Sequence, residues 1–215
     1  MKLWTWIFIA LLALPLLAFG DDEHGTEITI YSGISFPNLD VESQPCIFCA
    51  GPFPVDVIVP LTTTTSLGHS FLFGVKAGVY LNPNIQLEGN FGIAPHQEFR
   101  QVSGIFCPPG QICPLIPVFL YQQNVVSYFY DGDFVYNFMK GNVRPFAEVG
   151  LGATSANVRD TTSTDFTLVY GGGAKFYFRN FGFRFEVNDH LTPNNFLTKD
   201  TEHYVQVQYG FLFRL

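Results

Sequence analysis

Apolar and polar residues alternate with a period of two along most of the chain, most clearly at its C-terminus. From Val205 to Leu215 the odd-numbered residues are apolar or aromatic, and the even-numbered residues are mostly polar or small. Successive side chains of a β-strand point to opposite faces of the sheet, so this pattern predicts a strand with one apolar face. Because the alternation recurs in segment after segment, we predict an all-β fold.

The first twenty residues differ from the rest of the chain. Lys2 is their only charged residue, and a short, almost wholly apolar run follows it. Small residues then lead to Gly20, an arrangement typical of a secretory signal peptide. An uncleaved membrane anchor is the alternative, but the apolar run is short for a span and contains Pro15. We therefore predict an exported protein with a signal peptide at 1–20 and one domain at 21–215.

The composition indicates what the apolar faces contact. Charged residues make up 13% of the chain and aromatic residues 17%, whereas soluble domains contain about 25% charged residues. A soluble barrel keeps its apolar residues inside and needs a charged exterior, and this chain has too few charges for one. The alternation therefore favours a barrel whose outer face contacts lipid. A net charge of −7 without a basic run argues against nucleic-acid binding.

Eight segments carry the alternation, at about 26–36, 69–81, 85–93, 122–138, 143–151, 166–178, 183–187 and 205–215. Three links between them are short, near Asn82, Gly141 and Asn180. Four links are longer, at about 37–68, 95–121, 157–164 and 192–201. Short turns at one end and long loops at the other are typical of bacterial outer-membrane barrels. We therefore predict an eight-stranded antiparallel up-and-down transmembrane β-barrel in the outer membrane of a Gram-negative-type bacterium.

Charged residues lie in phase on the face opposite the apolar one. Five are positive and five are negative: Lys76, Arg144, Lys175, Arg184 and Arg214, with Glu88, Asp131, Asp133, Glu148 and Glu186. The interior of an eight-stranded barrel is only wide enough for side chains to fill it, and buried charges must be paired. We therefore predict an internal salt-bridge network that plugs the barrel. The alternative is a proton or ion path along the same residues.

Three segments resemble the strands of a known family. Residues 143–152 (VRPFAEVGLG) resemble its R-P-Y-x-x-x-G-x-G strand, residues 171–178 (GGGAKFYF) its G-x-G-x-K-Y strand, and residues 183–190 (FRFEVNDH) its L-R-x-E-x-R-D strand. This is the outer-membrane β-barrel domain family of small eight-stranded barrels, such as OmpA and OmpX. The resemblance implies no shared catalytic residues. Such barrels usually end in an aromatic residue, whereas this chain ends in Leu215, and we expect no further domain after the last strand.

Four cysteines lie in the two longest predicted loops, Cys46 and Cys49 in one, and Cys107 and Cys113 in the other. Exported proteins meet an oxidising compartment, so we predict disulfide bonds. Of the three possible pairings we favour local closure within each loop, whereas cross-pairing would join the two loops. A redox or zinc site is the alternative, but neither a thioredoxin-like pattern nor a histidine pair surrounds these cysteines.

The predicted loops 37–68 and 95–121 are also rich in proline and apolar residues. Loops displayed by a rigid scaffold often carry function, and exposed apolar patches often mark contacts. We expect these loops either to pack on themselves and the outer leaflet or to bind an extracellular protein partner. Outer-membrane lipid and lipopolysaccharide are the other expected partners. We predict a monomer that has no cofactor and no bound metal.

The tripeptide His190-Leu191-Thr192 prompts an enzyme hypothesis. Outer-membrane lipid A deacylases are small barrels with a His-x-Ser pair and a glutamate near the rim. In this chain threonine replaces serine, and Glu202 is the candidate acid. Such a set acts only when its members lie within hydrogen-bond reach. We predict a non-enzymatic role in envelope integrity or surface contact, with a deacylase-like lipid hydrolase and a small-solute pore as the alternatives.

Overall fold

The computed structural model describes residues 25–38, 40–48, 59–105, 119–158, 161–193 and 201–215. These residues form ten strands, namely β1 (Thr26–Asn38), β2 (Asp40–Phe48), β3 (Val59–Leu67), β4 (Ser70–Asn82), β5 (Ile85–Ile105), β6 (Phe119–Asn137), β7 (Val143–Val158), β8 (Thr161–Phe178), β9 (Phe181–Thr192) and β10 (Glu202–Arg214). Within this described part, no helix is long and apolar enough to cross a membrane. The predicted signal peptide lies outside the described residues.

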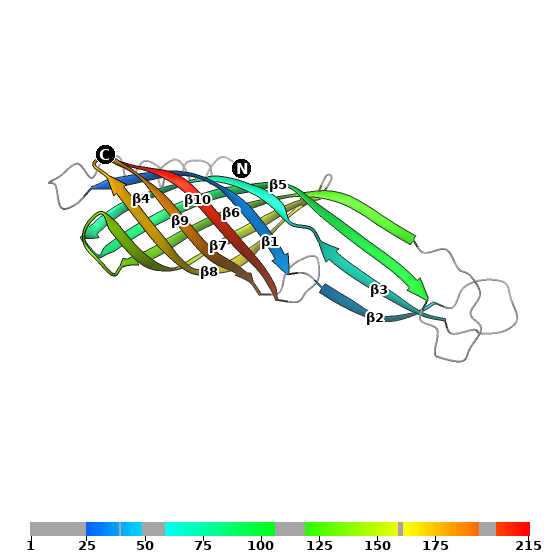
Figure 1. Cartoon of the computed structure of the whole chain (residues 1–215). Coiled ribbons are helices and arrows are strands. Elements are labelled where there is room, and N and C mark those ends of the chain that lie inside the picture. Colours follow the sequence, from blue (N-terminus) through cyan, green and yellow to red (C-terminus); the bar gives the residue numbers. More distant parts are fainter. Residues whose placement is uncertain (1–24, 39, 49–58, 106–118, 159–160, 194–200) are drawn as a thin grey trace, which may run out of the picture.

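Eight of the ten strands form a closed antiparallel barrel (Figure 1). Hydrogen-bonded neighbours follow the order β5-β4-β1-β10-β9-β8-β7-β6, and β6 pairs with β5 to close the ring. Closure satisfies the backbone hydrogen-bonding groups of every barrel strand, which the interior of a bilayer requires because it offers no water. The predicted eight-stranded antiparallel barrel is therefore confirmed.

Burial along the barrel strands follows the alternation of the sequence. In β9 and β10 every second side chain points into the barrel and is buried, while those between are exposed. The exposed side chains are apolar or aromatic around the whole circumference, as one example from each barrel strand shows: Ile30, Phe71, Leu87, Phe134, Val149, Tyr170, Phe185 and Val207. A continuous apolar belt of this kind is the surface that a transmembrane barrel presents to lipid.

The prediction that residues 37–68 form a loop was wrong, because most of this segment forms a hairpin. β2 pairs with β3, and β3 pairs with the end of β5, where Leu61 lies opposite Ile105. The run Thr62–Thr65 has β-branched side chains, which favour strands, but it lacks the apolar alternation by which the barrel strands were located. A strand without a continuous apolar face gives no period-two signal.

The predicted loops 95–121 and 157–164 were also too long. β5 continues to Ile105 and pairs with β6 as far as Ser103, opposite Phe119. β8 begins at Thr161, which lies opposite Val158 of β7. Strands β2, β3, β5 and β6 therefore project beyond one end of the barrel as a sheet (Figure 1). We call this the projecting sheet.

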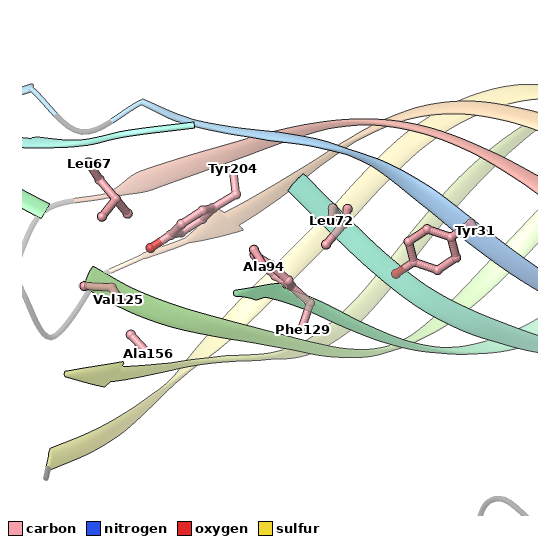
Figure 2. Packing of buried hydrophobic residues seen from close by; sticks show 8 residues of the cluster. All are labelled: Tyr31, Leu67, Leu72, Ala94, Val125, Phe129, Ala156 and Tyr204. Carbon is pink, nitrogen blue, oxygen red and sulfur yellow. The ribbon is translucent and has the colours of Figure 1, made fainter. Parts of the chain in front are cut away.

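An apolar cluster fills the barrel at the end nearest the projecting sheet (Figure 2). Its centre is Phe129, whose ring meets those of Tyr204 and His190 edge-on, with centroids 5.7 Å and 5.1 Å away. The cluster comprises Tyr31, Leu67, Leu72, Ala94, Val125, Phe129, Ala156 and Tyr204. These inward apolar residues lie between the polar middle of the lumen and the projecting sheet.

Candidate functional site: the charged lumen

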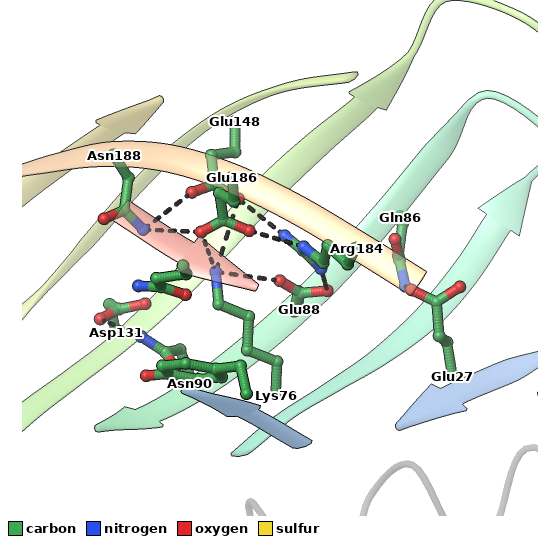
Figure 3. A network of polar contacts seen from close by, with 12 residues as sticks. Glu27, Lys76, Gln86, Glu88, Asn90, Asp131, Glu148, Arg184, Glu186 and Asn188 are labelled. Carbon is green, nitrogen blue, oxygen red and sulfur yellow. Dashed lines mark hydrogen bonds and ion pairs between the residues drawn. The ribbon is translucent and has the colours of Figure 1, made fainter. Parts of the chain in front are cut away.

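Two cations and three glutamates occupy the middle of the lumen (Figure 3). Inward positions of four strands supply them: Lys76 on β4, Glu88 on β5, Glu148 on β7, and Arg184 and Glu186 on β9. The Nζ atom of Lys76 lies 3.7 Å from Oε1 of Glu88 and 3.8 Å from Oε2 of Glu148. It also forms a close ion pair with Glu186. One lysine thus contacts carboxylates from three other strands.

Arg184 contacts the same three glutamates as Lys76. Its Nη1 atom lies 2.6 Å from Oε2 of Glu88, and its Nε atom lies 2.5 Å from Oε2 of Glu186. Its Nη2 atom lies 3.0 Å from Oε2 of Glu148. No side chain in this central network is more than 2% exposed. Charge-assisted hydrogen bonds in such a place are strong, and removing one partner leaves buried charges uncompensated.

A second network lies nearer the short turns. The Nζ atom of Lys175 donates to Oε1 of Glu27 at 2.7 Å and to Oε1 of Gln86 at 2.6 Å. The other carboxylate oxygen of Glu27 accepts hydrogen bonds from the hydroxyl groups of Tyr177, at 2.6 Å, and Tyr80, at 3.1 Å. Glu27 was not among the predicted interior charges. Its position one residue before the outward Ile28 places it in phase with the inward set, so the alternation contained the signal for it.

Arg144 and Arg214 lie at the mouth beyond this second network. Their guanidinium carbons lie 5.0 Å and 3.6 Å from the ring centroid of Tyr177, within cation–π range. The Nε atom of Arg144 also donates to the carbonyl oxygen of Gly141 at 3.0 Å. These two arginines therefore cover the mouth of the lumen by stacking on an aromatic ring.

A third group of polar contacts lies between the central network and the apolar cluster. The Nε2 atom of His190 lies 3.0 Å from Oδ2 of Asp131, and Nδ2 of Asn90 donates to the same oxygen at 3.0 Å. The hydroxyl of Tyr31 donates to Oδ1 of Asn90 at 2.8 Å. Asp131 thus contacts His190, the histidine of the His190-Leu191-Thr192 tripeptide. Asp133 differs from the other interior acids, because neither of its carboxylate oxygens accepts a hydrogen bond from a donor group, and its nearest polar neighbour is the carboxyl group of Asp131.

The three residues of the deacylase hypothesis are occupied in separate contacts. His190 contacts Asp131, and the hydroxyl of Thr192 lies 3.1 Å from that of Thr167. Glu202 accepts a hydrogen bond from the hydroxyl of Tyr204 at 2.6 Å. All three side chains point inward and are buried. This arrangement favours a packing role, since the acyl chains of a lipid in the membrane reach only the outer face of the barrel.

The cysteine predictions concern parts of the chain for which no side chain is described. Cys49, Cys107 and Cys113 lie outside the described residues, and for Cys46 only the backbone of β2 is described. The disulfide bonds therefore remain predictions. In the sequence, Cys49 follows the end of β2 at Phe48, and Cys107 and Cys113 fall between the end of β5 at Ile105 and the start of β6 at Phe119.

Comparison with known proteins agrees with this architecture. The structure is similar to OprG from Pseudomonas aeruginosa, with a TM-score of 0.58, 11% identity, and coverage of 90% of this chain and 97% of OprG. It is also similar to Neisserial surface protein A (TM-score 0.53, 11% identity, coverage of 92% and 100%). No curated protein sequence matches the chain. The family model for the outer membrane protein beta-barrel domain matches residues 6–211, and the chain therefore belongs to that family.

Proposed function

We propose that this protein is an outer-membrane barrel of structural or surface-interaction type whose lumen is closed to solutes. The observation that carries this proposal is the central network, in which Lys76 and Arg184 link glutamates on β5, β7 and β9 across the barrel. The apolar belt supports outer-membrane lipid as the surrounding medium, and closure of the ring supports a monomer, since the barrel-forming part of each strand is paired on both sides.

A conducting state would require the central network to open. Separating either cation from its glutamates would leave buried charges without partners, at a cost of about 3–5 kcal/mol for each broken pair. The Phe129 cluster would still close the end nearest the projecting sheet. A solute would have to pass both the central network and the Phe129 cluster to cross the lumen. A small-solute pore is therefore the less favoured alternative.

The purified, refolded protein is therefore expected to give no steady single-channel current in planar lipid bilayers. The matched comparison is the double variant Lys76→Ala/Phe129→Ala, which shortens one side chain in each of the two barriers. Only the variant is expected to show discrete conductance steps. Steady currents from the wild-type protein would show that the lumen opens and would favour the pore.

Surface contact is the second part of the proposal, and the projecting sheet supports it. In the described part of the chain, β2 pairs only with β3 and so forms one edge of this sheet, while residues 119–125 of β6, which pair only with β5, form the other. The free edge of a strand offers unpaired backbone N–H and C=O groups, to which an extended segment of a partner protein adds as a further strand. Disulfides among Cys46, Cys49, Cys107 and Cys113 would hold the tips of the sheet in place. We propose an extracellular protein as the partner.

Deleting residues 39–67 is expected to abolish such binding without unfolding the barrel. Ser35 of β1 lies opposite Ser70 of β4, so joining Asn38 to Gly68 leaves a five-residue connection, which is long enough for a hairpin. Binding of the wild-type and shortened proteins to an array of immobilised extracellular proteins measures the effect. The fraction that migrates as folded protein on gels is the control. Equal binding by two folded proteins would exclude the hairpin as the contact surface.

A further inference from the structure

Asp133 lies in an environment unlike that of the other inward acids. Its side chain points into the lumen from β6, only 3% of the residue is exposed, and neither Oδ1 nor Oδ2 accepts a hydrogen bond from a donor group. Its carboxyl group instead lies within hydrogen-bond reach of the carboxyl group of Asp131. Burying an ionised carboxylate without a partner is strongly unfavourable, so such a group binds a proton, a cation or a hydrogen-bond donor. We therefore expect a proton, a cation or a hydrogen-bond donor beside the carboxylate of Asp133.

Space for the Asp133 carboxylate comes from a glycine on the neighbouring strand. Gly150 of β7 is the backbone partner of Asp133, and a Cβ atom at Gly150 would lie only 1.9 Å from Oδ1 of Asp133. On the opposite side the backbone partner of Asp133 is Glu88 of β5. The carboxylate of Asp133 is thus held over a glycine and next to a second acid.

Glu88, Asp133 and Glu148 converge on one small volume. Each offers one carboxylate oxygen, and these three oxygens all lie within 4.8 Å of one another. Oε1 of Glu88 also has no hydrogen-bond partner, its nearest cation being Lys76 at 3.7 Å. Calcium binds oxygen ligands at about 2.3–2.6 Å, so two ligands of one ion are separated by at most about 5 Å. The spacing of the three oxygens lies within this limit.

The charges of the central network lead to the same conclusion. Lys76 and Arg184 contribute two positive charges, whereas Glu88, Glu148, Glu186 and Asp133 contribute four negative charges, which leaves a net charge of −2. Asp131 lies outside this sum, because it is hydrogen-bonded to His190 and Asn90 and does not contact Lys76 or Arg184 in an ion pair. One divalent cation neutralises the remaining charge. Ligands that are all carboxylate oxygens select hard cations over those that prefer nitrogen or sulfur.

We propose that Glu88, Asp133 and Glu148 bind one hard divalent cation, of the calcium or magnesium class, inside the barrel. The ion joins β5, β6 and β7, and Arg184 connects this group to β9 through Glu88 and Glu148. The site differs from the zinc site at the cysteines that was considered from the sequence. The competing occupant is a proton shared by Asp131 and Asp133, which are successive inward residues of β6.

The test is to refold the protein into detergent with EDTA, with CaCl₂ or with MgCl₂, remove free ions, and measure bound metal by mass spectrometry. Refolding allows the ion to enter before the lumen closes. We expect one divalent ion per chain, and an increase in melting temperature with the metal relative to EDTA. Asp133→Asn removes a charged ligand at nearly constant volume and is expected to weaken binding at least about 100-fold. The wild-type protein refolded with calcium and with magnesium also shows which ion the site prefers.

Asp189→Asn is the matched control, because Asp189 contacts Tyr170 and His203 instead of the central network. It should bind metal like the wild-type protein. If Asp133→Asn does not fold, Glu88→Gln replaces it, since a glutamine oxygen still accepts a hydrogen bond from Arg184. Absence of bound metal after refolding with either salt, or equal binding by the wild-type protein and a folded ligand variant, would overturn the proposal and favour the shared proton.

Discussion

Replacing Arg184 with alanine is expected to lower the free energy of unfolding by about 3–5 kcal/mol, the cost of breaking buried ion pairs by removing one partner. Arg184 donates to Glu88, Glu148 and Glu186, and the guanidinium is only 2% exposed. Without it, Lys76 alone would face the three glutamates. Water would enter the space left by the side chain only in part, because the neighbouring residues remain packed.

Urea titration of the protein in lipid vesicles measures this effect, with unfolding followed by circular dichroism and by the gel mobility of the folded form. Tryptophan fluorescence is not suitable, because both tryptophans lie within the first six residues, inside the predicted signal peptide. The control is Arg100→Ala. Arg100 pairs with Glu98 at 2.6 Å, but these side chains are 54% and 35% exposed, so the expected loss is about 0–1 kcal/mol. Equal losses in the two variants would mean that the lumen is hydrated and its ion pairs are screened.

The second large effect is expected on the outer face of the barrel. Val207→Arg should destabilise the folded protein by about 2–4 kcal/mol, the cost of an arginine that faces lipid at the bilayer midplane. Val207 lies near the middle of β10, is 45% exposed, and has the outward apolar residues Ile34 and Val187 as its backbone partners. The nearest acid on this face, Asp189 opposite Val205, is already hydrogen-bonded to Tyr170 and His203.

The fraction of protein that folds into vesicles, and its urea midpoint, measure this second prediction. Val207→Ala is the matched control and should have a small effect, because lipid chains fill the space that is left. Gln208→Ala tests the inner face and should also be mild, since Gln208 donates one hydrogen bond, to Gln206. If Val207→Arg folded as well as these two variants, the face assigned to lipid would contact water instead.

The alternation of the sequence was sufficient to predict the barrel because the two faces of each strand meet different media. Lipid outside and a crowded polar lumen inside impose a period of two wherever a strand crosses the membrane, as in the run from Phe183 to Asn188. The hairpin of β2 and β3 was missed because its strands have no such contrast between their faces. Glu27 was not predicted as an interior charge, although it is in phase with the inward residues.

The sequence does not show which interior side chains contact each other. His190 and Asp131 are 59 residues apart in the chain and meet only because β6 and β9 face each other across the lumen. The sequence around Asp133 likewise does not indicate that no donor group would reach its carboxylate oxygens. Pairing across a barrel depends on strand tilt and register, which the pattern of any single strand does not contain.

The amino-acid sequence by itself determined that this chain forms an eight-stranded barrel, which residues face outward, and that charges face inward, because each of these follows from the local period of a strand. Only the tertiary structure decided which charges pair, that a sheet projects beyond the barrel, and that Glu88, Asp133 and Glu148 converge. Those features arise where side chains from distant strands share one confined volume, so their energies depend on the closed ring as a whole.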